Sequence, residues 1–214
     1  MKNIIGIGLI LISVSCQSKE HKISKIVKEP VKMEVDKSLE VATFAGGCFW
    51  CTEAVFLELD GVKSVVSGYI GGKNANPTYE EVSRGDTGHA EATQITFDPK
   101  KISYGELLEI FFATHDPTTL NRQGADVGTQ YRSEVFYNSE EQKKITEDYI
   151  ALMTAEDTFG KPIVTKVSKA PAFYPAEDYH QNYYSRNQNQ SYCSYVITPK
   201  VKKVKEHFKD KLKK

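Results

Sequence analysis

The stretch Thr43-Phe44-Ala45-Gly46-Gly47-Cys48-Phe49-Trp50-Cys51-Thr52-Glu53 predicts the end of a strand, a tight turn and the start of a helix. We expect the strand over Val41–Ala45 and the helix from Cys48 towards Leu59, because two glycines allow the backbone to turn tightly between them. A cysteine in the first turn of a helix lies beside unpaired N–H groups, which favour the thiolate. The pKa of Cys48 is therefore expected to be lowered and its sulfur to be nucleophilic.

A second thiol and two aromatic rings accompany Cys48. Cys51 follows three residues later, which on a helix is the same face one turn away. Phe49 and Trp50, the only tryptophan of the chain, lie between the two cysteines. This combination favours a redox-active site. The alternative is a structural pair, or a buried cysteine on an apolar helix face.

Composition limits the class of protein. The 214 residues suit one domain of moderate size with extensions. Lys plus Arg and Asp plus Glu number 28 each, so no excess of charge predicts a nucleic-acid partner. Four cysteines, at positions 16, 48, 51 and 193, are too few and too unevenly spaced for a disulfide scaffold.

Residues 1–16 have the features of an export signal. A basic start at Lys2 precedes an apolar run, Ile4 to Ile12, that is too short to span a bilayer. The small residues before Cys16 resemble a bacterial lipoprotein signal, in which this cysteine becomes the lipidated first residue, although Ser13 stands where Leu is usual. We expect an exported protein of the bacterial cell envelope, lipid-anchored on the periplasmic side. Ordinary secretion, with Cys16 lost or free, is the alternative.

Two further segments complete the predicted organisation. Residues 17–38 are rich in Lys and Glu and are expected to form a charged, flexible tether, with an extra helix or edge strand as the alternative. Residues 39–214 are expected to form a single domain.

Hydrophobic periodicity and turn signals predict the remaining elements of that domain. Strands are expected over Val62–Ile70, His89–Asp98, Tyr131–Tyr137 and Ile163–Val167. Helices are expected from the capping box at Thr78, over Ser103–Ala113, over Ser139–Phe159 and from Thr198 onwards. Residues 114–130 are predicted to be a functional loop, and 170–195 an ordered coil that carries Cys193, with a possible short helix over Glu177–Arg186.

Glu91 is the candidate acid. Alternation along the predicted strand places it on the same face as Ile95 and Phe97. Burial there would raise its pKa and keep it protonated near neutral pH. A solvated or salt-bridged carboxylate at the end of the strand is the alternative.

The Cys-x-x-Cys spacing and a distant third cysteine permit three kinds of chemistry. A zinc site needs four ligands, normally in two close pairs, and Cys193 has no close cysteine partner, which disfavours zinc. A thioredoxin-like disulfide oxidoreductase has the same spacing but does not require the acid or the aromatic rings. A peroxidase-like or sulfoxide-reducing enzyme oxidises its cysteine to a sulfenic acid, which a second cysteine resolves. The non-enzymatic alternative is a lipoprotein that binds a partner and whose cysteines only form a structural disulfide.

Several motifs over about residues 40–195 resemble the A-type peptide-methionine sulfoxide reductases. They are Gly47-Cys48-Phe49-Trp50, Asn76-Pro77-Thr78-Tyr79, Gly85-Asp86-Thr87-Gly88-His89-Ala90-Glu91, His115-Asp116-Pro117, Gly128-Thr129-Gln130-Tyr131-Arg132-Ser133 and Ala176-Glu177-Asp178-Tyr179-His180-Gln181. Agreement of several separate motifs is more specific than one short match. The resemblance implies an α+β domain of two-layer ferredoxin-like type, with a mixed sheet flanked by helices and a long coiled C-terminal tail.

The resemblance also implies roles for the residues. Cys48 would attack the sulfoxide sulfur of an oxidised methionine, free or in a protein, and Glu91 would protonate the sulfoxide oxygen. The other matched positions are Tyr79 and Tyr131, which would hydrogen-bond that oxygen, Phe49 and Trp50, which would hold the substrate methyl group, and Asp126, which would orient the substrate backbone. Without the family match, the two tyrosines read as core residues and Asp126 as a turn former. The family reduces the S epimer.

The remaining expectations concern the cysteines, the cofactor and the partners. Many family members have Gly where this chain has Cys51, and Cys193 matches a resolving cysteine of other members, so either could attack the sulfenic acid first. We favour Cys51 because it is near Cys48, with Cys193 as relay. No metal or organic cofactor is expected. A thioredoxin-like protein would be the reductant, and the enzyme would be a monomer.

Three histidines, His89, His115 and His180, are expected to be structural.

Overall fold

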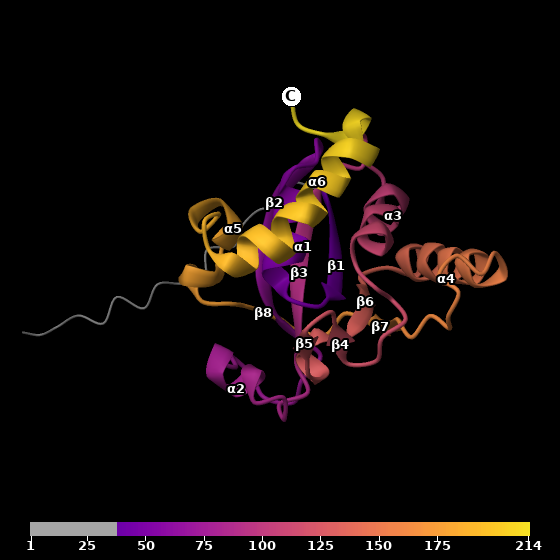
Figure 1. Cartoon of the computed structure of the whole chain (residues 1–214). Coiled ribbons are helices and arrows are strands. Elements are labelled where there is room, and N and C mark those ends of the chain that lie inside the picture. Colours follow the sequence, from indigo (N-terminus) through magenta and orange to yellow (C-terminus); the bar gives the residue numbers. More distant parts are fainter. Residues whose placement is uncertain (1–37) are drawn as a thin grey trace, which may run out of the picture. The chain divides into compact units, whose positions relative to one another are not determined.

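A six-stranded mixed sheet forms the centre of the computed structural model, which describes residues 38–214 (Figure 1). The strand order is β7-β6-β1-β3-β2-β8. The strands are β1 (Glu40–Gly46), β2 (Val62–Ile70), β3 (Ala90–Phe97), β6 (Ser133–Tyr137), β7 (Lys166–Lys169) and β8 (Phe173–Pro175). Neighbouring strands are antiparallel except β6 and β7, which are parallel. The α+β class with a mixed sheet is therefore confirmed.

Four longer helices accompany the sheet: α1 (Phe49–Leu57), α3 (Tyr104–Thr114), α4 (Glu140–Ala155) and α6 (Thr198–His207). One face of the sheet packs against α1 and α3, where Phe44 of β1 stacks on Phe111 of α3 with ring centroids 4.8 Å apart. Helix α6 lies against α1 and α3 and adds the buried Val204 to the same core (Figure 1). Figure 1 shows these helices gathered on one side of the strands.

Shorter elements complete the chain. They are α2 (Tyr79–Ser83), α5 (Tyr183–Arg186), the two-stranded ribbon β4 (Arg122–Gln123) and β5 (Asp126–Val127), the 3₁₀ turns η1 (Thr129–Tyr131), η2 (Asp178–His180) and η4 (Lys209–Lys211), and the π-helical turn η3 (Cys193–Ile197). The predicted functional loop 114–130 thus contains the β4–β5 ribbon. In the described residues no helix is both long and apolar enough to cross a membrane.

Most predicted elements are found, with shifted ends. The strand over Val62–Ile70 is confirmed, whereas the helix predicted to reach Phe159 ends at Ala155 and the strand predicted at Ile163 begins at Lys166. Strand β8 was missing from the sequence prediction because three residues carry too little periodicity. The predicted export signal, its Cys16 and the tether, apart from Ser38, lie outside the described residues.

Candidate active site

The turn between β1 and α1 places Cys48 at the N-terminal end of the helix. Gly47 has φ of +93°, and a Cβ atom there would lie 2.5 Å from the Gln123 side chain, so only glycine fits. Cys48 is the N-cap residue of α1, and its carbonyl accepts the Cys51 N–H at 3.0 Å. Both thiols are therefore set by the same turn, and both are buried.

Glu91 lies on β3 and faces the beginning of α1. Its side chain is 2% exposed, and its Oε2 accepts the backbone N–H of Phe49 at 3.1 Å. Burial, with a further contribution from the negative charge of Asp126, raises the pKa of Glu91 to about 8. Glu91 is therefore a neutral acid at pH 7, and of the two alternatives that the sequence left open the buried one holds.

The expectation of a lowered pKa for Cys48 is wrong for the free protein. Burial raises the pKa of this thiol well above its ordinary value, and the neighbouring Cys51 and Glu91 raise it further. One of the free N–H groups at the helix N-terminus, that of Phe49, is bonded to Glu91 instead of to the Cys48 sulfur. Cys48 is consequently a thiol at rest.

Cys51 is the more acidic of the two thiols. Its pKa is lowered to about 7, first because it accepts a hydrogen bond from Cys48, and then because of the positive charge of Lys200. Burial opposes both effects. Near neutral pH, Cys51 is thus the thiol of the pair that loses its proton first.

One cavity is lined by the predicted site residues other than Cys51 and Cys193. It has a volume of about 160 Å³ and is lined by Cys48, Phe49, Trp50, Tyr79, Glu91, Asp126, Tyr131 and Tyr192. Burial raises the pKa of both Tyr79 and Tyr131, so both phenols stay protonated and can donate hydrogen bonds into the cavity. The cavity therefore offers a thiol, a neutral carboxylic acid, two phenol donors and two aromatic rings to one small ligand.

Comparison with known proteins agrees with this set of groups. The family model described as peptide methionine sulfoxide reductase matches residues 40–212. The chain belongs to the peptide methionine sulfoxide reductase family. It is 59% identical over 174 residues to the peptide methionine sulfoxide reductase MsrA of Deinococcus radiodurans, covering 81% of this chain and 84% of that protein. The peptide methionine sulfoxide reductase MsrA of Sulfolobus acidocaldarius is 61% identical over 173 residues, covering 81% of this chain and 97% of that protein.

Solved structures of the family have the same fold. The crystal structure of reduced Mxr1 from Saccharomyces cerevisiae gives a TM-score of 0.67 at 34% identity and covers 73% of this chain and 90% of that one. Methionine sulfoxide reductase A of Corynebacterium diphtheriae gives 0.65 at 32% identity, covering 75% and 80%.

The C-terminal segment of the reductase holds Trp50 in place. The indole N–H of Trp50 donates to Nδ1 of His180 at 3.1 Å. The Tyr183 ring stacks on the indole, with ring centroids 3.7 Å apart. Burial lowers the pKa of His180, which keeps the imidazole neutral and able to accept this bond. His180 is therefore a hydrogen-bond acceptor that fixes the orientation of the Trp50 ring.

The other two histidines are also structural. Nδ1 of His89 accepts the Gly72 N–H at 3.1 Å, and Nε2 lies 2.8 Å from the Asn74 carbonyl oxygen. The His115 nitrogens lie 2.7 Å from the Phe111 carbonyl oxygen and 2.8 Å from the Ser133 hydroxyl.

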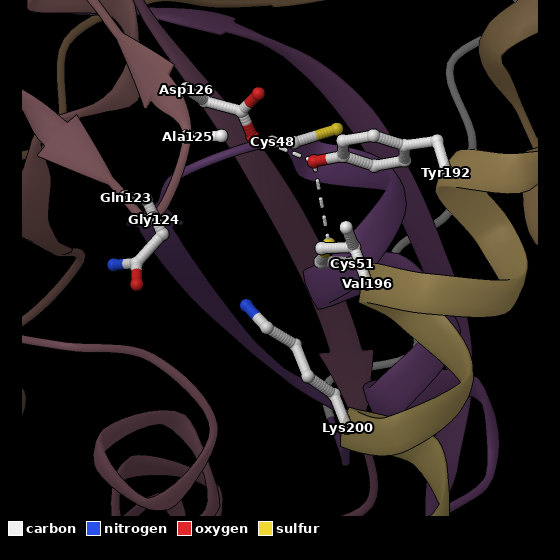
Figure 2. Close-up of a pocket in the computed structure, with 9 residues that line it drawn as sticks. All are labelled: Cys48, Cys51, Gln123, Gly124, Ala125, Asp126, Tyr192, Val196 and Lys200. Carbon is white, nitrogen blue, oxygen red and sulfur yellow. Dashed lines mark hydrogen bonds between the residues drawn. The ribbon is translucent and has the colours of Figure 1, made fainter.

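Tyr192 is the site residue that the sequence did not reveal. Its hydroxyl donates to Oδ2 of Asp126 at 2.6 Å and lies 3.9 Å from the sulfur of Cys51 (Figure 2). The only signal was its place directly before Cys193 in a tyrosine-rich segment, where no periodicity indicates a buried side chain.

Cys193 does not lie in a coil as expected. It begins the π-helical turn η3, which continues directly into α6, and it is fully buried in the same apolar cluster as Cys48 and Cys51. Cys48, Cys51 and Cys193 are all free thiols. Within residues 38–214, no three His, Cys, Asp or Glu side chains are grouped so that they could hold a metal ion.

Proposed function

We propose that this protein reduces methionine-S-sulfoxide, free or in proteins, to methionine with the thiol of Cys48. The observation that carries the proposal is the shared cavity, in which the Cys48 thiol and the protonated Glu91 lie among Phe49, Trp50 and two phenols. A sulfoxide has a polar oxygen and an apolar methyl group, and this cavity supplies partners for both. Asp126 would orient the substrate backbone.

The first step transfers the oxygen to Cys48. The Cys48 sulfur attacks the sulfoxide sulfur while Glu91 gives its proton to the oxygen, which Tyr79 and Tyr131 hydrogen-bond. The attack forms a sulfur–sulfur bond, which breaks again as the protonated oxygen passes from the substrate sulfur to the Cys48 sulfur, so methionine leaves and Cys48 becomes a sulfenic acid. Cys48 starts as a thiol, so its own proton replaces the one that Glu91 gave away. Thiol and sulfoxide thus become sulfenic acid and thioether with no proton gained or lost overall.

Resolution of the sulfenic acid needs a second thiol. We propose that Cys51 attacks first, because it lies one turn from Cys48 and is the more acidic thiol. Cys193, buried in the same cluster, would then exchange with the disulfide. An external thioredoxin-like dithiol would restore the reduced enzyme, without a resident metal or organic cofactor.

Activity on resolved sulfoxide epimers tests the proposal. With dithiothreitol as reductant, we expect the wild-type protein to turn over the S epimer of a methionine sulfoxide peptide and Cys48→Ser to show no turnover. Reduction of insulin disulfides without sulfoxide reduction would instead indicate a general disulfide oxidoreductase. Absence of both activities would favour a lipoprotein that only binds a partner.

We also propose that the reductase domain, residues 39–214, acts as a monomer exported to the bacterial cell envelope and anchored by a lipid on Cys16. The support is the signal-like sequence before Cys16, which lies outside the residues matched to the family. Mass spectrometry of the N-terminal peptide tests this, since an unmodified Cys16 in the mature protein would contradict it.

The antiparallel order β6-β1-β3-β2 supports a ferredoxin-like arrangement of the core strands.

A further inference from the structure

A second cavity touches the two thiols of the site. Its volume is about 150 Å³, and it is lined by Cys48, Cys51, Gln123, Gly124, Ala125, Asp126, Tyr192, Val196 and Lys200 (Figure 2). Cys48, Asp126 and Tyr192 line both cavities, but Glu91, Tyr79 and Tyr131 line only the first. The second cavity therefore has no neutral acid for a sulfoxide, and Cys51 and Lys200 are the groups that distinguish it.

Lys200 brings an ammonium group to this second cavity. It lies in the first turn of α6, is partly buried, and extends into the cavity in which Cys51 lies (Figure 2). Among residues 38–214 it makes neither a hydrogen bond nor an ion pair, whereas other lysines of α6 are partnered. Lys202 lies 3.7 Å from Glu206 and Lys205 lies 3.0 Å from Glu58.

Two anionic groups compete for this charge. Asp126 lines the same cavity, but its Oδ2 already accepts the Tyr192 hydroxyl at 2.6 Å. The Cys51 sulfur has only the weak contact with the Tyr192 oxygen at 3.9 Å and its interaction with Cys48. A Cys51 thiolate would therefore have no strong hydrogen-bond donor in this cavity, and the Lys200 ammonium is the positive group that can stabilise it.

We propose that Lys200 is a positioning residue that holds Cys51 as a thiolate and thereby makes Cys51, not Cys193, the first thiol to attack the Cys48 sulfenic acid. This inference rests on the proposed function, because it concerns the second step of that reaction. The Cys51 thiolate attacks the Cys48 sulfur, a sulfur–sulfur bond forms, and the sulfur–oxygen bond breaks. The oxygen leaves as hydroxide and takes the proton of Glu91 to become water.

The states of the two competing thiols support this order. The pKa of Cys51 is about 7, and the positive charge of Lys200 is one cause of the lowering, after the hydrogen bond from Cys48. Burial raises the pKa of Cys193, which is fully enclosed at the start of η3. A thiol that stays protonated attacks slowly, so the charge of Lys200 favours Cys51. The groups facing Cys51 from all packed elements are Cys48, Glu91, Asp126, Tyr192, Cys193 and Lys200.

The test compares Lys200→Met with Lys200→Arg in the full chain, during a single turnover of methionine sulfoxide without reductant. Lys202→Met is the matched control, because Lys202 lies on the same helix with its side chain 72% exposed. Three quantities are measured: methionine released per enzyme, the rate of disulfide formation, and the cysteines joined, mapped by mass spectrometry. The pH dependence of iodoacetamide labelling at Cys51 is followed in parallel.

With Lys200→Met we expect the same methionine yield per enzyme as in wild type, but disulfide formation roughly fivefold slower, the loss that follows from removing a partly screened unit charge. Labelling of Cys51 should move to higher pH, and the share of Cys48–Cys193 disulfide should rise. Lys200→Arg and Lys202→Met should behave as wild type.

Unchanged labelling, rate and disulfide pattern in Lys200→Met would overturn the inference. If Lys200→Met does not fold, Lys200→Gln replaces it. The same changes in labelling, rate and disulfide pattern are then expected, and their absence would overturn the inference. Failure of the wild-type enzyme to release methionine would count against the proposed function instead, so the two failures are distinguishable.

Discussion

Cys48 and Glu91 lie together at the start of α1. The N–H of Phe49, the residue after Cys48, donates to Glu91 at 3.1 Å. Both side chains are buried, so each keeps its proton in the free enzyme. Cys48 and Glu91 are therefore a neutral thiol and a neutral acid at rest, and charge develops on this pair only when a sulfoxide accepts the proton of Glu91.

Glu91→Gln tests the acid at the residue scale. Gln has nearly the same shape and can still accept the Phe49 N–H, so the variant should fold. It has no proton to give to the oxygen, so we expect the rate of methionine formation in a single turnover to fall by roughly a hundredfold or more. Circular dichroism provides the control for folding. A rate equal to that of wild type would remove Glu91 from the chemical step.

The pKa of Glu91 also predicts how activity and stability depend on pH. Sulfoxide reduction should decline as pH rises through about 8, where Glu91 loses its proton. Because the pKa is raised above its ordinary value of 4.5, the native state binds more protons between these values, and the free energy of unfolding should fall as pH rises from 4.5 to 8. Urea denaturation of wild type and Glu91→Gln at pH 5 and pH 8 measures this. An equal loss in both proteins would assign the effect to other groups.

At the scale of elements, two helices begin with the same capping box. Thr78 accepts the Glu81 N–H at 3.3 Å and caps α2, and Ser103 accepts the Glu106 N–H at 3.2 Å and caps α3. Both caps are exposed, but only α2 begins with a site residue, Tyr79. The pair therefore separates the effect of a cap on stability from its effect on the site.

Thr78→Ala and Ser103→Ala should each lower the free energy of unfolding by about 1 kcal/mol. Only Thr78→Ala should also lower kcat/KM, because it loosens the turn that positions the Tyr79 phenol. Urea unfolding and steady-state kinetics on a sulfoxide peptide give the two readouts. An equal loss of kcat/KM in both variants would mean that stability alone, not the position of Tyr79, is responsible.

At the scale of the whole molecule, residues far apart in the chain enclose the site. Buried Glu53 of α1 accepts the N–H of Asn182 at 2.9 Å and the N–H of Tyr183 at 3.3 Å. Glu177 accepts the Tyr79 N–H at 2.9 Å. These two carboxylates attach the C-terminal segment to the helices of the site, and Tyr183 then stacks on Trp50.

Glu53→Ala should therefore affect both stability and the site. It removes two half-buried hydrogen bonds to a carboxylate, so we expect a loss of roughly 2 kcal/mol or more in the free energy of unfolding. The fluorescence of Trp50, the only tryptophan, should change as Tyr183 is released. Glu53→Gln keeps one acceptor oxygen and should lose less. Unchanged fluorescence in Glu53→Ala would show that the segment stays attached by other contacts.

The sequence by itself determined the elements and the chemical groups. The glycine turn, the two capping boxes and the alternation that places Glu91 among core residues all follow from local backbone preferences and side-chain periodicity. The aromatic, phenol and carboxyl groups of the cavity were likewise predicted by position, through the resemblance to the family.

Only the tertiary structure decided the protonation states and the surroundings of the cysteines. The raised pKa of Cys48, the contact of Tyr192 with Asp126 and Cys51, and the place of Lys200 beside Cys51 all depend on elements distant in sequence. The physical reason is that burial and charge act through space, where β3, the β4–β5 ribbon and α6 meet the first turn of α1. The local sequence pattern predicts which titratable group is present, but the residues that pack around this group in the fold determine whether it is protonated.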